Sequence, residues 1–321
     1  MTVSPTITAQ TSAGGAAEAQ PRDRVVPNAK TLDEHADFLR DYVRLQLWFL
    51  WTWLSQHPDE PFRNAIRARV DIYRKTNLNP GWSKNTATAM EHADDTRWPE
   101  LETEAYGVYL RLRDESADLF EHEAWPLFRP CVEARVERDF SEGDGLDDYQ
   151  CGSLRYHEPR LFLSHRLSEY LSYLRHGRPR RVFFHIGNRV SPQSIFADRE
   201  YLPRCFFQLM NETRTRYCAG ALTTTTWLNS YPVWLALFPR QWHENLRPPR
   251  DDVNWSQAWW GQFITARGTF NHRRGAELRR TGRFAFRPRS SWCTFASLEQ
   301  HLREYTADPA SEHVWTTRKR P

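Results

Sequence analysis

Apolar residues recur at helical spacing in the first half of the chain and gather into short runs in the second half. Between residues 31 and 57, Phe38 and Tyr42 belong to an apolar set with a period near 3.6, which indicates an amphipathic helix. Thr31 followed by Glu34 forms a capping box at its start. The same spacing predicts further helices in 60–73, 98–120 and 124–140. Two prolines near the start of the last segment, Pro126 and Pro130, indicate a break there.

Three runs in the second half are short, apolar or β-branched, and end in polar residues. They are Val182–Ile186, Ala219–Thr226 and Gly261–Ala266. Helical patterns separate them, in 201–217 and from Ser230 to Trp242. Strands that alternate with helices of this length are typical of a parallel sheet with right-handed crossovers. The sequence therefore predicts an α/β fold, with a helical N-terminal half followed by a βαβαβ unit and a mostly parallel sheet.

Composition divides the chain into three parts. Residues 1–27 are dominated by small polar residues and lack the apolar stretch of a signal peptide, so they are predicted to be a disordered tail. Residues 28–145 form the mainly helical region, and 146–321 form the α/β region with the expected site. The most apolar run, Leu45–Leu54, is far shorter than the ~20 residues that cross a bilayer, so no membrane association is expected.

Charge and cysteine content narrow the functional classes. The net charge is +4, and acidic residues are common beside the short runs of arginine, so no nucleic-acid partner is expected. The five cysteines are irregularly spaced and include no C-x-x-C, which favours the reducing cytoplasm over a secreted disulfide framework. Neither G-x-x-x-x-G-K nor a strand followed by G-x-G-x-x-G occurs, and no cofactor is predicted.

The candidate site follows from the predicted strands, because ligands of open parallel sheets bind beyond the carboxyl ends of the strands. His185, near the end of an apolar strand beside Phe183 and Phe184, is the predicted general acid or base, and Asp198 is predicted to orient it. Polar and aromatic residues that flank the predicted strands are predicted to bind substrate or exclude water: Asn188, Trp227, Asn229, Ser230, Trp260, Arg267, Asn271 and His272.

Structural roles compete with several of these assignments. A lone histidine in a strand is often a core residue with satisfied hydrogen bonds, and we weigh that role for His185 about equally with the catalytic one. Asp198 is equally suited to cap the helix that begins near Glu200, and a helix cap is the stronger interpretation of Ser230.

A metal site is the main chemical rival. His157, Glu158 and His165 lie close together in sequence, and His185 could join them as a ligand for zinc or iron. Pro159 interrupts the helix that would align the first two with the third, so no metal is predicted there. Residues 121–123 (Glu-His-Glu) form another cluster, but neighbours on a helix point in different directions.

These patterns predict an enzyme that performs acid–base chemistry on a small polar anion. Elimination, cyclisation or isomerisation in specialised metabolism would suit a site without an evident cofactor. Two alternatives remain open. One is a metal-dependent hydrolase or oxygenase, and the other is a non-catalytic subunit of a heteromeric enzyme. A homo- or hetero-oligomer is compatible with each of them.

Overall fold

The computed structural model describes residues 30–73, 98–142, 149–156 and 179–307. The predicted tail, 1–27, lies outside these residues, and so do His157, Glu158 and His165 of the metal alternative. The predicted division into a helical and an α/β region stays a prediction, although helices do dominate the first half of the described chain.

The first three helices of the N-terminal half begin close to the residues that the sequence predicts, whereas the fourth begins earlier than predicted. The described elements of this half are α1 (Leu32–Gln56), α2 (Phe62–Arg69), the 3-10 turn η1 (Asp71–Tyr73), α3 (Trp98–Leu112), α4 (Ala117–Glu133) and α5 (Val136–Glu142). The capping box of α1 is confirmed. Thr31 Oγ1 accepts a hydrogen bond from the Glu34 N–H at 3.2 Å, and the Glu34 carboxylate accepts one from the Thr31 N–H at 2.8 Å.

The predicted helix break near Pro126 and Pro130 is wrong. The chain turns earlier, at 113–116, and Ser116 caps the start of α4 by accepting a hydrogen bond from the Leu119 N–H. Both prolines lie inside α4 on its exposed side. The helical carbonyls that lose a partner to each proline therefore lie near solvent, where water can satisfy them.

The sheet is small and mixed, which corrects the predicted fold class. Its strands are β1 (Tyr149–Cys151), β2 (Leu154–Tyr156), β3 (Arg181–Ile186), β4 (Ala221–Thr226) and β5 (Arg289–Thr294), in that spatial order. Among these described strands one neighbouring pair, β3 with β4, is parallel, and the other three pairs are antiparallel. A mostly parallel βαβαβ sheet is therefore wrong.

The first half of the predicted βαβ unit is confirmed. β3 and β4 are parallel neighbours, with Val182 opposite Leu222 and Phe183 opposite Thr223. Helix α7 (Tyr201–Tyr217) connects them, as a parallel pair requires a crossover. The carboxyl ends of these two strands therefore lie side by side.

The third predicted strand, Gly261–Ala266, does not form. Its first residues are the 3-10 turn η4 (Gly261–Phe263), and its end is a loop joined by one bridge between Ile264 and Phe270. The Gln262 side chain explains the turn, because its amide donates to the carbonyl oxygens of Trp259 and Phe286 at 2.8 and 2.9 Å. β5 takes the place beside β4 and runs antiparallel to it.

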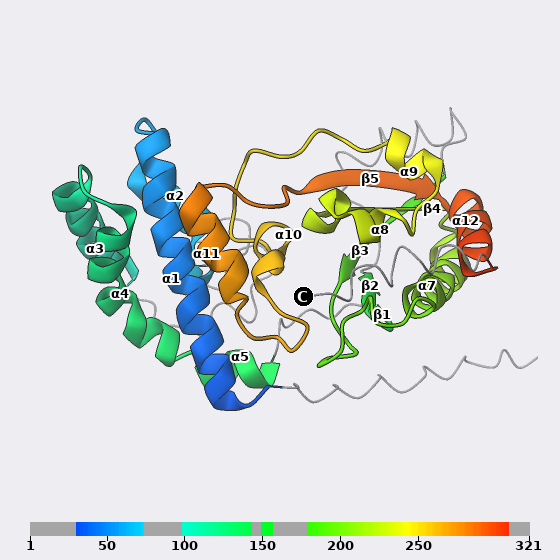
Figure 1. The fold of residues 1–321 in the computed structure, drawn as a ribbon, viewed down its shortest axis with the longest axis horizontal. Coiled ribbons are helices and arrows are strands. Elements are labelled where there is room, and N and C mark those ends of the chain that lie inside the picture. Colours follow the sequence, from blue (N-terminus) through cyan, green and yellow to red (C-terminus); the bar gives the residue numbers. More distant parts are fainter. Residues whose placement is uncertain (1–29, 74–97, 143–148, 157–178, 308–321) are drawn as a thin grey trace, which may run out of the picture.

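Short helical pieces replace the long helix expected from Ser230 to Trp242. The remaining elements of the second half are η3 (Trp227–Ser230), α8 (Pro232–Leu235), α9 (Arg240–Glu244), α10 (Gln257–Trp260), α11 (His272–Thr281) and α12 (Phe295–Ala307). Figure 1 shows the sheet at one end of the molecule and α1 to α4 at the other.

Helix α1 joins the two ends of the molecule through an aromatic cluster. One of its faces packs on α2, α3 and α4. Its other face sends Tyr42 and Phe49 against Trp260, with ring centroids 6.0 and 5.8 Å apart, and Phe49 also meets Phe284 at 5.1 Å. In Figure 1, α1 accordingly lies between α4 and α11. No helix in the described ranges has both the length and the apolar character needed to cross a bilayer.

His35 in α1 makes the stability of this assembly depend on pH. The side chain is buried between Phe38 and Phe140, and neither ring nitrogen has a hydrogen-bond partner among the described residues. Burial lowers its pKa from 6.5 to about 4, and the nearby Lys30 ammonium adds to the shift. Between these values the unfolded chain binds more protons, so the contribution of neutral His35 is present above pH 6.5 and is lost as pH falls toward 4.

We therefore expect acidification from pH 7 to pH 5 to cost about 2 kcal/mol of unfolding free energy through His35. Replacing His35→Phe should remove this part of the dependence, because phenylalanine does not titrate. Urea unfolding at both pH values measures it, with the exposed His122→Gln as the matched control. Equal losses between pH 7 and pH 5 in the wild type and His35→Phe would contradict the assignment.

Candidate functional site

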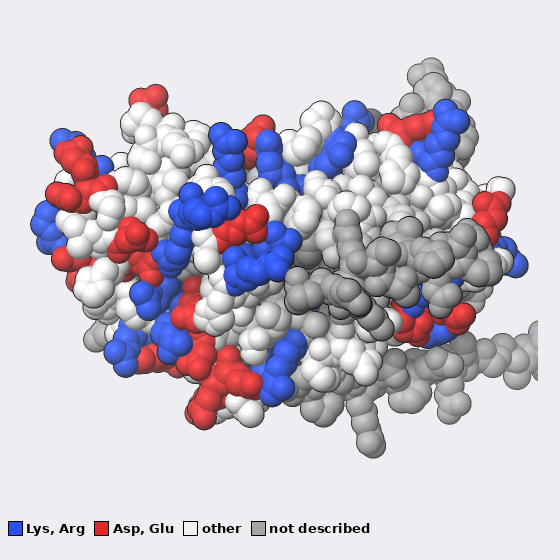
Figure 2. Space-filling view, viewed as in Figure 1, with Lys and Arg blue, Asp and Glu red and all other residues white. Residues whose placement is uncertain are grey.

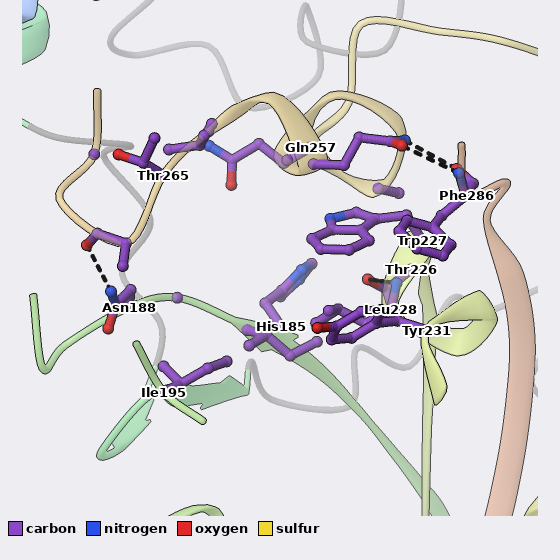
Figure 3. A pocket seen from close by; sticks show the side chains of 18 of the residues that line it. His185, Asn188, Ile195, Thr226, Trp227, Leu228, Tyr231, Gln257, Thr265 and Phe286 are labelled. Atoms are coloured by element: carbon purple, nitrogen blue, oxygen red, sulfur yellow. Dashed lines mark hydrogen bonds between the residues drawn. The ribbon is translucent and has the colours of Figure 1, made fainter. Parts of the chain in front are cut away.

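A cavity of about 1140 Å³ opens at the carboxyl ends of β3 and β4. Residues 185–189 at the end of β3 and 224–228 at the end of β4 form one side. Residues 255–258, 261–262 and 264–268, which include parts of α10 and η4, form the facing side together with Phe286. In Figure 3, His185 points from β3 toward the side where Trp227 and Tyr231 lie, and Gln257 lies across the cavity from it.

Positive charge dominates the lining. Six cationic side chains line the cavity, and no Asp or Glu is among the described lining residues: Lys30, Arg155, Arg189, Arg250, Arg267 and Arg274. Carboxylates behind the lining pair with three of these cations, namely Glu34 with Arg267, Asp252 with Arg250 and Glu277 with Arg274. The cavity surface itself therefore offers donors and positive charge, which suits an anionic ligand.

His185 lies on the cavity side of β3, but not in the surroundings that the sequence predicts. Val182 and Phe184 point into the core beneath the sheet, so Phe184 faces away from His185. Phe183 shares its side, with its ring 5.0 Å from the imidazole in an edge-on arrangement. Arg155 lies directly opposite His185 on β2, so the two side chains lie on the same face of the sheet.

Asp198 does not line the cavity with His185. Its carboxylate accepts a hydrogen bond from the Glu200 N–H at 2.8 Å and forms an ion pair with Arg204 at 2.5 Å, on an exposed surface. These contacts lower its pKa, the backbone hydrogen bond most and the arginine next. Asp198 is not the N-cap of α7 either, because that position belongs to Glu200, and Asp198 bonds to the Glu200 N–H just before the helix.

Asn229 and Ser230 fasten the chain after β4 and do not line the cavity. Asn229 is fully buried, and its amide donates to the Arg289 carbonyl at 2.7 Å and to the Thr224 carbonyl at 3.3 Å. Its side-chain oxygen accepts the Trp234 indole N–H at 3.0 Å. Ser230 donates to the Arg287 carbonyl at 2.7 Å, and it does not cap the helix that follows, because Tyr231 is the N-cap residue of α8.

Trp260 and His272 also lie away from the cavity. Trp260 is fully buried in the aromatic cluster on α1, and its indole N–H donates to the Asn254 carbonyl at 2.9 Å. His272 is 79 % exposed at the start of α11, 3.9 Å from Asp41. Their sequence neighbours Gly261 and Asn271 do line the cavity.

Asn188, Arg267 and Asn271 line the cavity, and each side chain also bonds to another part of the protein. The Asn188 amide donates to the Ala266 carbonyl at 2.7 Å, which ties the end of β3 to the facing loop (Figure 3). Arg267 pairs with Glu34 at 3.0 Å, and Asn271 caps α11. On the same loop, the Lys30 ammonium donates to the Gly268 carbonyl at 2.9 Å, and burial lowers its pKa to about 8.

Trp227 lines the cavity, and several other lining residues were not predicted from sequence. Tyr231, Gln257 and Phe286 line the same end of the cavity as Trp227 (Figure 3). Arg274 stacks over the Phe286 ring at 5.0 Å. Tyr231 could have been predicted from sequence, because it follows β4 closely. Nothing in the sequence around Gln257, Arg274 or Phe286 indicates that these residues line a cavity.

The metal alternative receives no new support from the described residues. Three of its four candidate ligands lie outside them, and within the described ranges no three His, Cys, Asp or Glu side chains gather as a metal site would require. Glu121 has another role. It is buried in α4 and pairs with Arg44 at 2.8 Å and with Arg279, so it holds α4 to α1 and α11.

The comparisons with known proteins do not identify this architecture. No protein-family model matches the chain, and neither a curated protein nor a solved structure matches it.

The structural role of Asn229 leads to a stability prediction. Asn229→Ala removes three hydrogen bonds in a dry environment and leaves the Trp234 N–H without its partner, so we expect a loss of about 2–4 kcal/mol in unfolding free energy. Ser230→Ala removes one hydrogen bond at a half-buried site and should cost about 1 kcal/mol or less. Chemical denaturation measures both. Similar small losses in the two variants would return Asn229 to the list of ligand-binding candidates.

Proposed function

We propose that this protein binds a small organic anion in the cavity at the ends of β3 and β4 and performs acid–base chemistry on it. One observation carries the proposal: six cations and a histidine line the cavity, and no carboxylate is among its described lining residues. Such a lining attracts an anion and repels a cation. Elimination, cyclisation or isomerisation in specialised metabolism remains the proposed reaction class.

His185 is the proposed proton carrier. It is half-buried at the cavity wall, where a substrate would exclude water from it. Tyr231 lines the cavity on the Trp227 side, and its hydroxyl is the proposed second proton-transfer or hydrogen-bonding group (Figure 3).

A binding protein without catalysis is the second candidate, and the position of Asp198 favours it. The predicted histidine–carboxylate pair does not form, because Asp198 bonds to Glu200 and Arg204 instead. A non-catalytic subunit of a heteromeric enzyme would need the anion-binding cavity but not that pair. Use of His185 as a metal ligand, as in a hydrolase or oxygenase, stays a third possibility from the sequence.

The proposed cellular setting follows the sequence. We place the protein in the cytoplasm and leave open a homo- or hetero-oligomer. We propose no nucleic-acid partner. Figure 2 shows Lys and Arg side chains over α11 with Asp and Glu side chains among them, whereas a nucleic acid favours a continuous basic stripe.

The proton-transfer role is tested with His185→Gln. The amide keeps polarity and much of the volume but cannot carry the proton, so turnover should fall by about 10²–10⁴-fold while anion binding persists. Turnover is measured on the substrate once one is found among candidate anions by thermal shift. Turnover that is unchanged in His185→Gln would support a structural histidine.

Anion binding is tested with two arginines on one helix. Arg274 lines the cavity, whereas its neighbour Arg273 is exposed and does not line it. Arg274→Gln should weaken binding of a carboxylate at least tenfold, because it removes a charged donor from a partly desolvated site. Arg273→Gln should leave the dissociation constant within twofold. Equal effects in a calorimetric titration would point to long-range attraction and against a specific site.

A further inference from the structure

The cavity has an aromatic end, formed by Trp227, Tyr231 and Phe286. The rings of Trp227 and Phe286 are stacked at 29° with centroids 5.8 Å apart, and Tyr231 meets Phe286 edge-on at 5.4 Å. All three are half-buried and line the cavity, so part of each ring surface faces it. Figure 3 shows this group beside the His185 imidazole.

Polar groups at the same end have unused hydrogen-bonding capacity. The Trp227 indole N–H, the Tyr231 hydroxyl and the Gln257 amide have no side-chain hydrogen bond to any other described residue. They come from η3, from the turn after it and from α10, and they surround one part of the cavity. Three separate elements therefore present donors and acceptors to a ligand and not to the protein.

A cation completes this end. The Arg274 guanidinium stacks on the Phe286 ring with 5.0 Å to the ring centroid, and one of its amino groups pairs with Glu277 at 2.7 Å. The stacking holds the guanidinium plane against the aromatic wall, so a ligand that packs on the wall meets a charged donor at its edge.

From these contacts we infer that the ligand class is a planar aromatic acid, with its ring packed on the Trp227–Tyr231–Phe286 wall and its carboxylate held by arginine. The Trp227 N–H, the Tyr231 hydroxyl and the Gln257 amide bind a hydroxyl or carbonyl group on the ring. This inference rests on the proposed anion-binding function and narrows its substrate class. It places the ligand ring within reach of His185.

The absence of a side chain at Gly261 leaves room for the Trp227 indole. A Cβ atom at this position would lie 2.9 Å from the Trp227 Nε1 atom, closer than such contacts occur, so alanine would push the indole toward the cavity. Gly261→Ala therefore changes the wall without removing an aromatic ring or a charge, which makes it a sharper probe than deletion of Trp227 alone.

The test compares two acids that share charge and hydroxyl group and differ in planarity. The probes are 4-hydroxybenzoate and trans-4-hydroxycyclohexanecarboxylate, titrated calorimetrically into the full chain, with inorganic phosphate as a third anion. An aromatic contact with two or three rings should make the planar acid bind at least tenfold more tightly. Trp227→Leu and Gly261→Ala should each reduce that preference to threefold or less, while Trp125→Leu in α4 should leave it unchanged.

The outcomes separate the two proposals. Equal binding of the two hydroxy acids by the wild type would overturn the aromatic inference and leave the anion-binding function standing. A preference that survives in both Trp227→Leu and Gly261→Ala would also overturn it, because the ring would then bind elsewhere. Failure of both acids and of phosphate to bind would overturn the anion-binding function as well.

Discussion

The site depends on the parallel pairing of β3 with β4. Two parallel neighbours end at the same edge of the sheet, and this places His185 from one strand across from Trp227, which follows the other. An antiparallel β4 would carry Trp227 to the opposite edge. The pairing in turn requires α7 as a crossover, and α7 covers the core side of the sheet with Leu202, Phe206 and Leu209.

The facing wall of the cavity is held from the other end of the molecule. Trp260 and Phe263 are anchored in the aromatic cluster on α1, and the loop that follows is tied by Lys30 to Gly268 and by Asn188 to Ala266. The N-terminal helices therefore position one side of the cavity through α1. A substitution in α1 that loosens this cluster is therefore expected to shift the segment that carries Trp260 and Phe263.

Local patterns predicted the elements whose burial repeats along the sequence. β3 is apolar, α7 has a clear helical period and α1 has a capping box, so each was found with nearly its observed bounds. β5 was missed because Arg289–Thr294 is mostly polar. Four of its six partners on β4 are threonines, and hydrogen bonds such as that from Thr223 to the Ser291 carbonyl at 2.7 Å add to the pairing. The third predicted strand failed because the tertiary bonds of Gln262 fold it into a turn.

Site residues likewise divide into those that local sequence predicts and those that only tertiary packing brings to the cavity. His185, Asn188 and Trp227 follow the strand ends, and the structure brings them to one cavity with Arg267 and Asn271. Asn229 had the same sequence signal but was recruited to buried hydrogen bonds, and a strand-end asparagine gives no local sign of which role it takes. Arg274 and Phe286 reach the cavity through tertiary packing of α11 and the segment before β5, which sequence periodicity does not encode.

The cations that line the cavity repel one another, and nearby carboxylates reduce this repulsion. Six cations close together repel one another, and the carboxylates of Glu34, Asp252 and Glu277 relieve this from behind the lining. The described lining of the cavity is therefore cationic. This charge is the basis of the proposal that the cavity binds an anion.

The most direct test of this account is a crystal of the protein soaked with 4-iodobenzoate, with the iodine located by anomalous scattering. The account predicts one iodine position in the cavity, packed against the Trp227 and Phe286 rings and within reach of His185. Iodine bound at other surfaces, with the cavity empty at a concentration that saturates binding in solution, would contradict it.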